Sequence, residues 1–311
     1  MNQLGFWILV TLLGFVGTPI LGLVVKWVDR LVTARIQWRK GPPFYQTFAD
    51  VLKLLGKETM ASEQASLPVF LLAPVLGYIG VGVAATLLWA VAIRPEAGFA
   101  GDLIVVIYFL VFPSLALILG ASASGSPHAG LGAAREMKLV AGYELPFILS
   151  VVPAILAAGN TFNLSGLVLA QSKGPVLWGV GGFMAFLCVL AAVQAKLGVV
   201  PFDQAEAETE LMGGVIVEYS GPPLALIYVM RAMLLLVLPM FVITVFWGGV
   251  QLAGWGLALT AVKFLVLVVV IVLVRNTCPR LRIDQAMKFF WLMVTPVAIV
   301  ACSLALVGAY G

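Results

Sequence analysis

Long apolar runs recur along this chain and limit its fold more than any other feature. A helix needs about 20 mostly apolar residues to cross a bilayer. Eight runs qualify, at roughly 4–25, 69–92, 102–121, 140–159, 176–195, 222–247, 252–274 and 287–308. The chain is 62% hydrophobic and 10% charged, whereas a soluble domain is about a quarter charged. The sequence therefore predicts an all-α polytopic membrane protein of about eight transmembrane helices, forming a single integral membrane domain over residues 1–311.

The basic residues sort by loop, which predicts how the chain lies in the membrane. Only Arg94 and Lys173 lie in the loops after spans two, four and six. The other loops carry Lys26, Arg30, Arg35, Arg39, Lys40, Lys53, Lys57, Arg135, Lys138, Lys196, Arg275, Arg280, Arg282 and Lys288. Loops rich in Lys and Arg stay in the cytoplasm. We therefore expect these loops to be cytoplasmic and both termini to lie outside.

The long connection between the first two spans has an amphipathic character. Its stretch Trp27–Leu55 alternates apolar and basic residues at near-helical spacing and is interrupted by Gly41-Pro42-Pro43. This pattern predicts amphipathic cytoplasmic surface helices. They would either anchor the chain to lipid headgroups or serve a partner-docking or ligand-gating role, and periodicity alone does not decide between these.

The interval 196–223 concentrates acidic residues between two apolar spans. It contains Asp203, Glu206, Glu208, Glu210 and Glu218. Partly desolvated carboxylates that lie close together cannot all ionise cheaply, so one or more should hold a proton near neutral pH. A single helix would bring four of the five to one face, but Gly213-Gly214 argues against an unbroken helix. The interval is either a proton relay or a solvated acidic loop that binds a basic partner.

Three charges stand out inside the predicted spans, away from the terminal residues of each span. Glu144 follows Tyr143 near the start of the fourth span, while Arg231 and Lys263 lie well inside the sixth and seventh. Charges at such depth usually face a bundle interior or a water-filled cavity. A proton or ion path is favoured for Arg231 and Lys263 over a purely structural ion pair, and for Glu144 the two readings stay open.

Two basic stretches could form a cytoplasmic opening or bind a hydrophilic partner, with topology-setting charge as the alternative. They are 35–40, with Arg35 and Arg39, and 280–285, with Arg280, Arg282 and Asp284. The three cysteines form no CxxC pair, so the sequence predicts no metal or iron–sulfur site on this chain. It contains no nucleotide loop or nucleophile–base pair, and its basic residues form no nucleic-acid-binding patch.

Several motifs together resemble one family. They are DRLVTARIQWRKGPPFYQTFADVLKLLGKE (29–58), GYELPF (142–147), VPFDQAEAETELMGGVIVEYSG (200–221) and RNTCPRLRIDQAMKF (275–289). This set is similar to the eight-helix membrane subunit shared by respiratory complex I, as its subunit 1 or H, and the energy-converting group 4 [NiFe]-hydrogenases, including formate hydrogenlyases. Gly41-Pro42-Pro43 and the run EYSGPPLAL (218–226) favour the hydrogenase branch. Asp29 and Gly142 depart from the complex I pattern and weaken a direct transfer of its quinone site.

The resemblance implies a non-catalytic subunit in the cytoplasmic (inner) membrane of a prokaryote, without a cofactor of its own. A hydrophilic arm carrying a [NiFe] centre and iron–sulfur clusters would dock on the cytoplasmic loops. The implied partners are the hydrogenase large and small subunits, a ferredoxin-like iron–sulfur subunit and antiporter-like membrane subunits. The five acids of 196–223 and Glu144 would couple redox chemistry to proton or sodium movement. The peripheral-arm contacts would be Arg35, Arg39, Asp50, Arg280, Arg282 and Asp284.

Three other functions stay open on the sequence alone. The chain could be the quinone-chamber subunit of a complex I-like oxidoreductase that uses NADH or ferredoxin. It could be a passive anchor that only holds the peripheral arm. A stand-alone transporter is disfavoured, because no pair of matching broken helices marks an inverted repeat.

Overall fold

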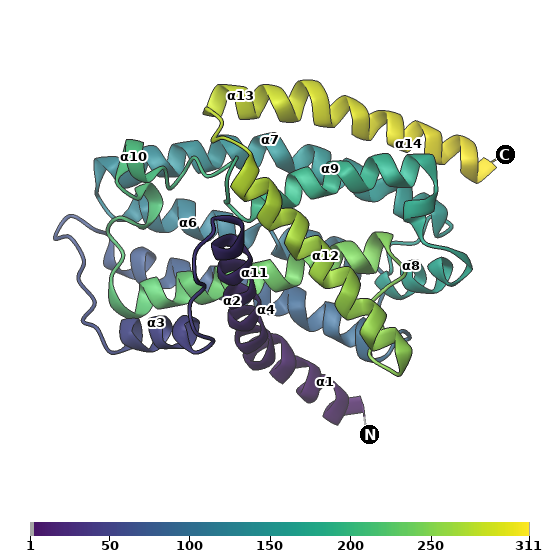
Figure 1. Cartoon of the computed structure of the whole chain (residues 1–311), viewed down its shortest axis with the longest axis horizontal. Coiled ribbons are helices and arrows are strands. Elements are labelled where there is room, and N and C mark those ends of the chain that lie inside the picture. Colours follow the sequence, from purple (N-terminus) through teal and green to yellow (C-terminus); the bar gives the residue numbers. More distant parts are fainter. Residues whose placement is uncertain (1–2, 311) are drawn as a thin grey trace.

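The protein is an all-helical bundle (Figure 1). The computed structural model describes residues 3–310, except for the side chains of Lys173, Glu208, Thr209, Ala309 and Tyr310. Within that part of the chain, seven helices are long and apolar enough to cross a membrane. A shorter apolar helix, Val180–Lys196, occupies the place of the fifth expected span, 176–195. The predicted all-α polytopic architecture is confirmed.

The α-helices have the following bounds. They are α1 Gln3–Leu12, α2 Thr18–Ile36, α3 Gln46–Leu55, α4 Leu67–Ile93, α5 Asp102–Phe109, α6 Phe112–Ala123, α7 Pro127–Ala157, α8 Leu164–Ala170, α9 Val180–Lys196, α10 Glu208–Leu211, α11 Gly221–Phe246, α12 Trp255–Thr277, α13 Ile283–Lys288 and α14 Thr295–Tyr310. Wider π-helical turns at Leu13–Gly17 and Phe289–Val294 join α1 to α2 and α13 to α14. Short 3-10 turns lie at Gln171–Lys173, Val176–Trp178 and Gly214–Ile216.

Two helices extend well beyond the apolar runs that predicted them. The first span continues through α2 to Ile36, and α7 begins at Pro127 instead of near residue 140. Hydropathy marks only where side chains are apolar, and a helix can continue where its polar side chains find partners in the protein. Charged residues assigned to loops from the sequence, such as Lys26 and Arg135, therefore stand on rigid helices.

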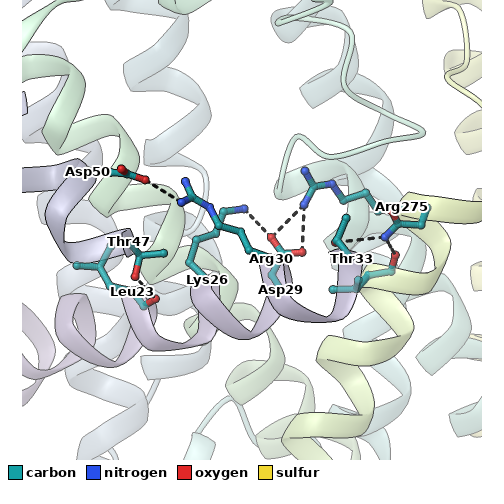
Figure 2. Close-up of polar contacts among 10 residues, drawn as sticks. Leu23, Lys26, Asp29, Arg30, Thr33, Thr47, Asp50 and Arg275 are labelled. Carbon is teal, nitrogen blue, oxygen red and sulfur yellow. Dashed lines mark hydrogen bonds and ion pairs between the residues drawn. The ribbon is translucent and has the colours of Figure 1, made fainter. Parts of the chain in front are cut away.

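The connection between the first two spans contains one surface helix, so the expectation of several was wrong. Residues 27–36 belong to α2, and only α3 is separate. The indole of Trp27 donates to the Pro42 carbonyl at 3.0 Å. The hydroxyl of Thr47 donates to the Leu23 carbonyl at 3.2 Å. The Thr47–Leu23 bond joins α3 directly to α2 (Figure 2). The Trp27–Pro42 bond holds the loop before α3 against α2 as well.

Helix α11 forms the centre of the bundle. Apart from Arg231 it is apolar on every side, and most of its second half is buried, as expected for a helix enclosed by others. Helix α2 approaches it closely at Gly22, where a Cβ atom would collide with the backbone at Ala232. Small residues at such crossings are typical of membrane helix packing. Helix α14 packs along α7 and α9 (Figure 1).

A charged cluster at one end of the bundle

The acidic interval is irregular, so the single helix considered from its sequence does not form. Its regular structure consists of α10 and the turn at Gly214–Ile216. Gly213 and Gly214 have φ values of 101° and 50°, which glycine adopts without steric cost. The buried ring of Phe202 packs against Phe289 and Phe290, with centroid distances of 5.7 and 4.9 Å. This aromatic contact holds the interval against the chain that follows α12.

Helix α2 carries a buried carboxylate that joins it to α12. The side chain of Asp29 is 4% exposed and accepts from Lys26 at 2.7 Å. It also accepts from Arg275 of α12 at 3.0 Å through each oxygen (Figure 2). On the other side of α2, Arg30 pairs with Asp50 of α3 at 2.7 Å. Asp50 is therefore engaged within the chain, and α2 links α3 to α12 through charged side chains.

Two acids of the irregular interval pair with arginines from other elements. Asp203 accepts from Arg280 at 2.6 Å. Glu206 accepts from Nη1 of Arg231, on α11, at 2.8 Å. Burial raises the pKa of Asp203 above its ordinary value, and the adjacent Arg280 opposes that rise. Asp203 thus lies in a site where proton uptake is easier than in water.

A third pair lies deeper in the bundle, between α7 and α9. Lys196 donates to Glu144 Oε2 at 2.6 Å, and the Lys196 side chain is 1% exposed. Its ammonium group lies over the rings of Tyr143 and Phe147, 5.1 and 4.5 Å from their centroids. Such rings stabilise a desolvated cation. Glu144 Oε1 is buried and accepts no hydrogen bond from the described residues.

Two cavities connect these pairs, and both have Asp203, Glu206 and Arg231 in their walls. The charged groups around the first are Glu136, Lys196, Asp203, Glu206 and Arg231. Those around the second are Lys26, Asp29, Asp203, Glu206, Arg231 and Arg275. The charges therefore form a row from the junction of α2 and α12 to the contact of α7 with α9. We call this row, with Arg280 and Glu144, the charged cluster.

A separate group of charges lies on the surface beside the charged cluster. Arg135 pairs with Glu210 at 2.5 Å, and the Glu210 side chain is 51% exposed. Arg135 lowers the pKa of Glu210 by hydrogen bonding and by its charge. The same depression contains Arg280, Arg282 and Asp284. Arg35 and Arg39 are also exposed, around a Trp38 side chain that is 98% exposed.

The remaining predicted site residues are not part of the charged cluster. Glu218 is half-buried and forms no ion pair with the described residues. Glu208 begins α10, but its side chain lies outside the described part of the structure. Lys263 of α12 donates to the Trp247 carbonyl, beyond the last residue of α11, at 2.7 Å. That contact lies at the opposite end of α11 from the acidic interval.

Sequence reasoning missed several members of the charged cluster. Asp29 was treated only as a departure from a family pattern, and Lys26, Lys196 and Arg275 only as topology-setting charges. Glu136 was not singled out at all. A signal for it was present, because it lies on a stripe with spacings of three and four residues, the pattern of a buried helix face. The buried members of that stripe are Ala129, Gly132, Ala133, Glu136, Leu139 and Tyr143.

Comparison with known proteins gives the family. Residues 8–306 match the family described as NADH dehydrogenase. The H subunit of NADH-quinone oxidoreductase from Geobacillus thermodenitrificans is 34% identical, over 96% of this chain and 90% of that protein. The corresponding protein of Dehalococcoides mccartyi, which carries the same name, is 33% identical, over 94% and 85%.

A solved structure shares both the fold and part of the sequence. It is a chain of the membrane-bound sulfane sulfur reductase, an archaeal respiratory membrane complex. The TM-score is 0.85 at 28% identity, and the match covers 96% of this chain and 99% of the other. Fold, motifs and relatives agree, and the chain belongs to the complex I subunit 1/H family of membrane subunits.

Proposed function

We propose that this chain couples a redox reaction in a hydrophilic arm to the movement of protons or sodium ions through the membrane. The observation that carries this proposal is the charged cluster, in which acids and bases from six parts of the chain surround two adjoining cavities. A structural role would need only isolated pairs. Paired titratable groups around shared space can exchange protons when a neighbouring charge changes.

Arg231 is the residue through which a proton on Glu206 would affect the other charges. It forms an ion pair with Glu206 and lines both cavities. A proton that neutralises Glu206 cancels the attraction between the two side chains, and Arg231 is then left to interact with the other acids nearby. Because buried charges are weakly screened, this local change propagates along the row. The charged cluster thus converts one protonation event into a redistribution of charge across the bundle.

The exposed charges supply a docking surface for the arm. Arg35, Arg39, Arg282 and Asp284 are exposed on segments beside the charged cluster. We propose that the arm is that of a membrane-bound hydrogenase, with hydrogenase large and small subunits, a ferredoxin-like subunit and antiporter-like membrane subunits as partners. The sequence features that support this branch are Gly41-Pro42-Pro43 and the 218–226 run.

A second candidate is the quinone-chamber subunit of a complex I-like oxidoreductase. It is favoured by the relatives at 33–34% identity, which are subunits of NADH-quinone oxidoreductases. The purified complex separates the two candidates directly. Hydrogen evolution without quinone dependence supports the hydrogenase branch, and quinone-dependent oxidation of NADH or reduced ferredoxin supports the complex I branch.

Glu206→Gln tests the coupling itself in the intact complex. Inverted membrane vesicles would be energised with NADH and with reduced ferredoxin in turn, and proton uptake followed by quenching of an acridine dye and sodium uptake by radiolabel. We expect the ions moved per electron to fall by about tenfold or more, because Gln keeps the shape of Glu but cannot accept a proton. The exposed loop variant Glu96→Gln is the matched control. Unchanged coupling in Glu206→Gln, with a correctly assembled complex, would leave the passive anchor as the better account.

A further inference from the structure

One buried acid in the charged cluster has no ion-pair partner among the residues that the structure describes. Glu136 of α7 is 6% exposed. Four other acids, Asp29, Glu144, Asp203 and Glu206, each form an ion pair within 4 Å, and Glu136 forms none among the described residues. An isolated buried carboxylate is costly, and such a group is retained most easily in its neutral, protonated form.

The surroundings of Glu136 come from every element that faces the first cavity. The Ser114 hydroxyl of α6 is a hydrogen-bonding neighbour of Glu136 and lies 3.1 Å from the Tyr143 hydroxyl. Arg231 of α11 and Asp203 of the irregular interval act on Glu136 through their charges. The same cavity wall also includes Glu206 and Lys196. Glu136 therefore shares a cavity wall with the Glu206–Arg231 pair and with Lys196, whose partner is Glu144.

We propose that Glu136 is the proton-holding residue that links these two ion pairs. The proposal rests on the proposed coupling function and identifies a residue within it that neither the family motifs nor the predicted relay set contains. The helical stripe described above directs the side chain toward the cavity rather than toward lipid. Ser114, which contacts the Tyr143 hydroxyl, lies beside Glu136 in the wall of the cavity that the other charges also line.

The transfer balances without any further reactant. A proton that binds Glu206 releases Arg231, whose guanidinium then stabilises the anionic form of Glu136. The O–H bond of Glu136 breaks, and its proton crosses the cavity to Lys196 as Lys196 passes a proton to Glu144, 2.6 Å away. Glu144 Oε1 accepts no hydrogen bond from the described residues, so it is free to carry the proton that Glu144 receives. The link resets when Glu144 releases its proton and the proton on Glu206 moves to Glu136, so that one proton passes through in each cycle.

The test compares Glu136→Gln, Glu136→Asp and Glu206→Gln in the assembled complex, with Glu96→Gln as the control. Ions moved per electron would be measured in inverted vesicles as above. Infrared difference spectra of the complex between its oxidised and reduced states would follow the stretching band of a protonated carboxyl group. We expect Glu136→Gln to lower coupling by about tenfold or more and to remove one such band. Glu136→Asp should restore a measurable part of the coupling.

The outcomes separate this inference from the coupling function. If Glu206→Gln loses coupling while Glu136→Gln matches Glu96→Gln, the assignment of Glu136 is overturned and the coupling function stands. If both variants match the control, both fail. Should Glu136→Gln not assemble, the Asp variant decides: a displaced carboxyl band with reduced coupling supports the link, and an unchanged spectrum with full coupling overturns it.

Discussion

Two basic side chains lie at α11, one within the helix and one at its end, yet their chemistry differs. Within the first half of α11, Arg231 pairs with the Glu206 carboxylate and lines the cavities of the charged cluster. Beyond its end, Lys263 donates to the backbone carbonyl of Trp247 and lies 5.9 Å from the centroid of its ring. Arg231 and Trp247 are roughly 24 Å apart along the helix axis, at 1.5 Å per residue.

We propose that the partner, and not the depth in the membrane, separates a relay residue from a structural one. A carboxylate can take up a proton and release its cation, whereas a backbone carbonyl cannot. Lys263 satisfies a carbonyl that the end of α11 leaves without a helical partner, and its charge complements the helix dipole there. The sequence favoured an ion path for both residues, and we now propose one only for Arg231.

The largest effect should follow from Arg231→Met. This change leaves Glu206 partly buried without its cation, and breaking such a pair costs about 3–5 kcal/mol. We expect a large fall in the thermal midpoint of the purified complex, or loss of assembly. The double variant Arg231→Met/Glu206→Met should recover part of the loss because no unpaired charge remains. If Arg231→Met alone is as stable as the native complex, the contrast between Arg231 and Lys263 fails.

Lys263→Met should have a smaller effect that is confined to stability. It removes one charge-assisted hydrogen bond to a helix terminus, which contributes about 1–2 kcal/mol. We expect ion movement per electron to stay at the native value in inverted vesicles, with a modest fall in the thermal midpoint. Loss of coupling in this variant would show that Lys263 takes part in ion movement. It would contradict the view that a lysine paired with a backbone carbonyl has only a structural role.

Asp203 should make the charged end sensitive to pH. Burial raises its folded-state pKa above the ordinary value of 3.8, against the opposing effect of Arg280. The folded state then binds more protons than the unfolded state. The resulting contribution to stability is complete below pH 3.8 and is lost as the pH rises through the raised folded pKa.

Arg280→Met would raise the pKa of Asp203 further and carry this loss to higher pH. Thermal midpoints measured over a pH series would detect the displacement. The double variant Arg280→Met/Asp203→Asn is the control, and it should not show this displacement because it lacks the titrating carboxyl group. If Arg280→Met does not change the pH dependence of the thermal midpoint, Asp203 does not titrate over the pH range measured.

The smallest effect should follow from Glu210→Gln. Arg135 lowers the pKa of Glu210, so its contribution to stability is present above the ordinary value of 4.5 and is lost as the pH falls through the lowered folded pKa. The pair is exposed and screened by salt. We expect a thermal midpoint close to native near neutral pH, with any difference removed at high salt. A loss of coupling equal to that of Glu206→Gln would place Glu210 in the relay as the sequence suggested.

The sequence identified much of the site but not its arrangement. Asp203, Glu206, Glu144 and Arg231 were all singled out, and the structure places them around two adjoining cavities or in direct pairs with their walls. Their partners were harder to foresee, because Lys196 and Glu144 are 52 residues apart in sequence. Ion-pair partners so far apart cannot be read from local spacing.

Apolar composition by itself determined that this chain is a helical membrane protein, because the bilayer offers no partners for an open backbone. The family motifs determined where the charged segments occur along the chain. Only the tertiary structure decided that α2 and α7 extend past their apolar runs, that Lys263 meets a carbonyl, and that Glu136 is buried without a counter-ion among the described residues. The physical reason is that hydropathy depends on each residue's own side chain, whereas ionisation depends on what the fold places beside it.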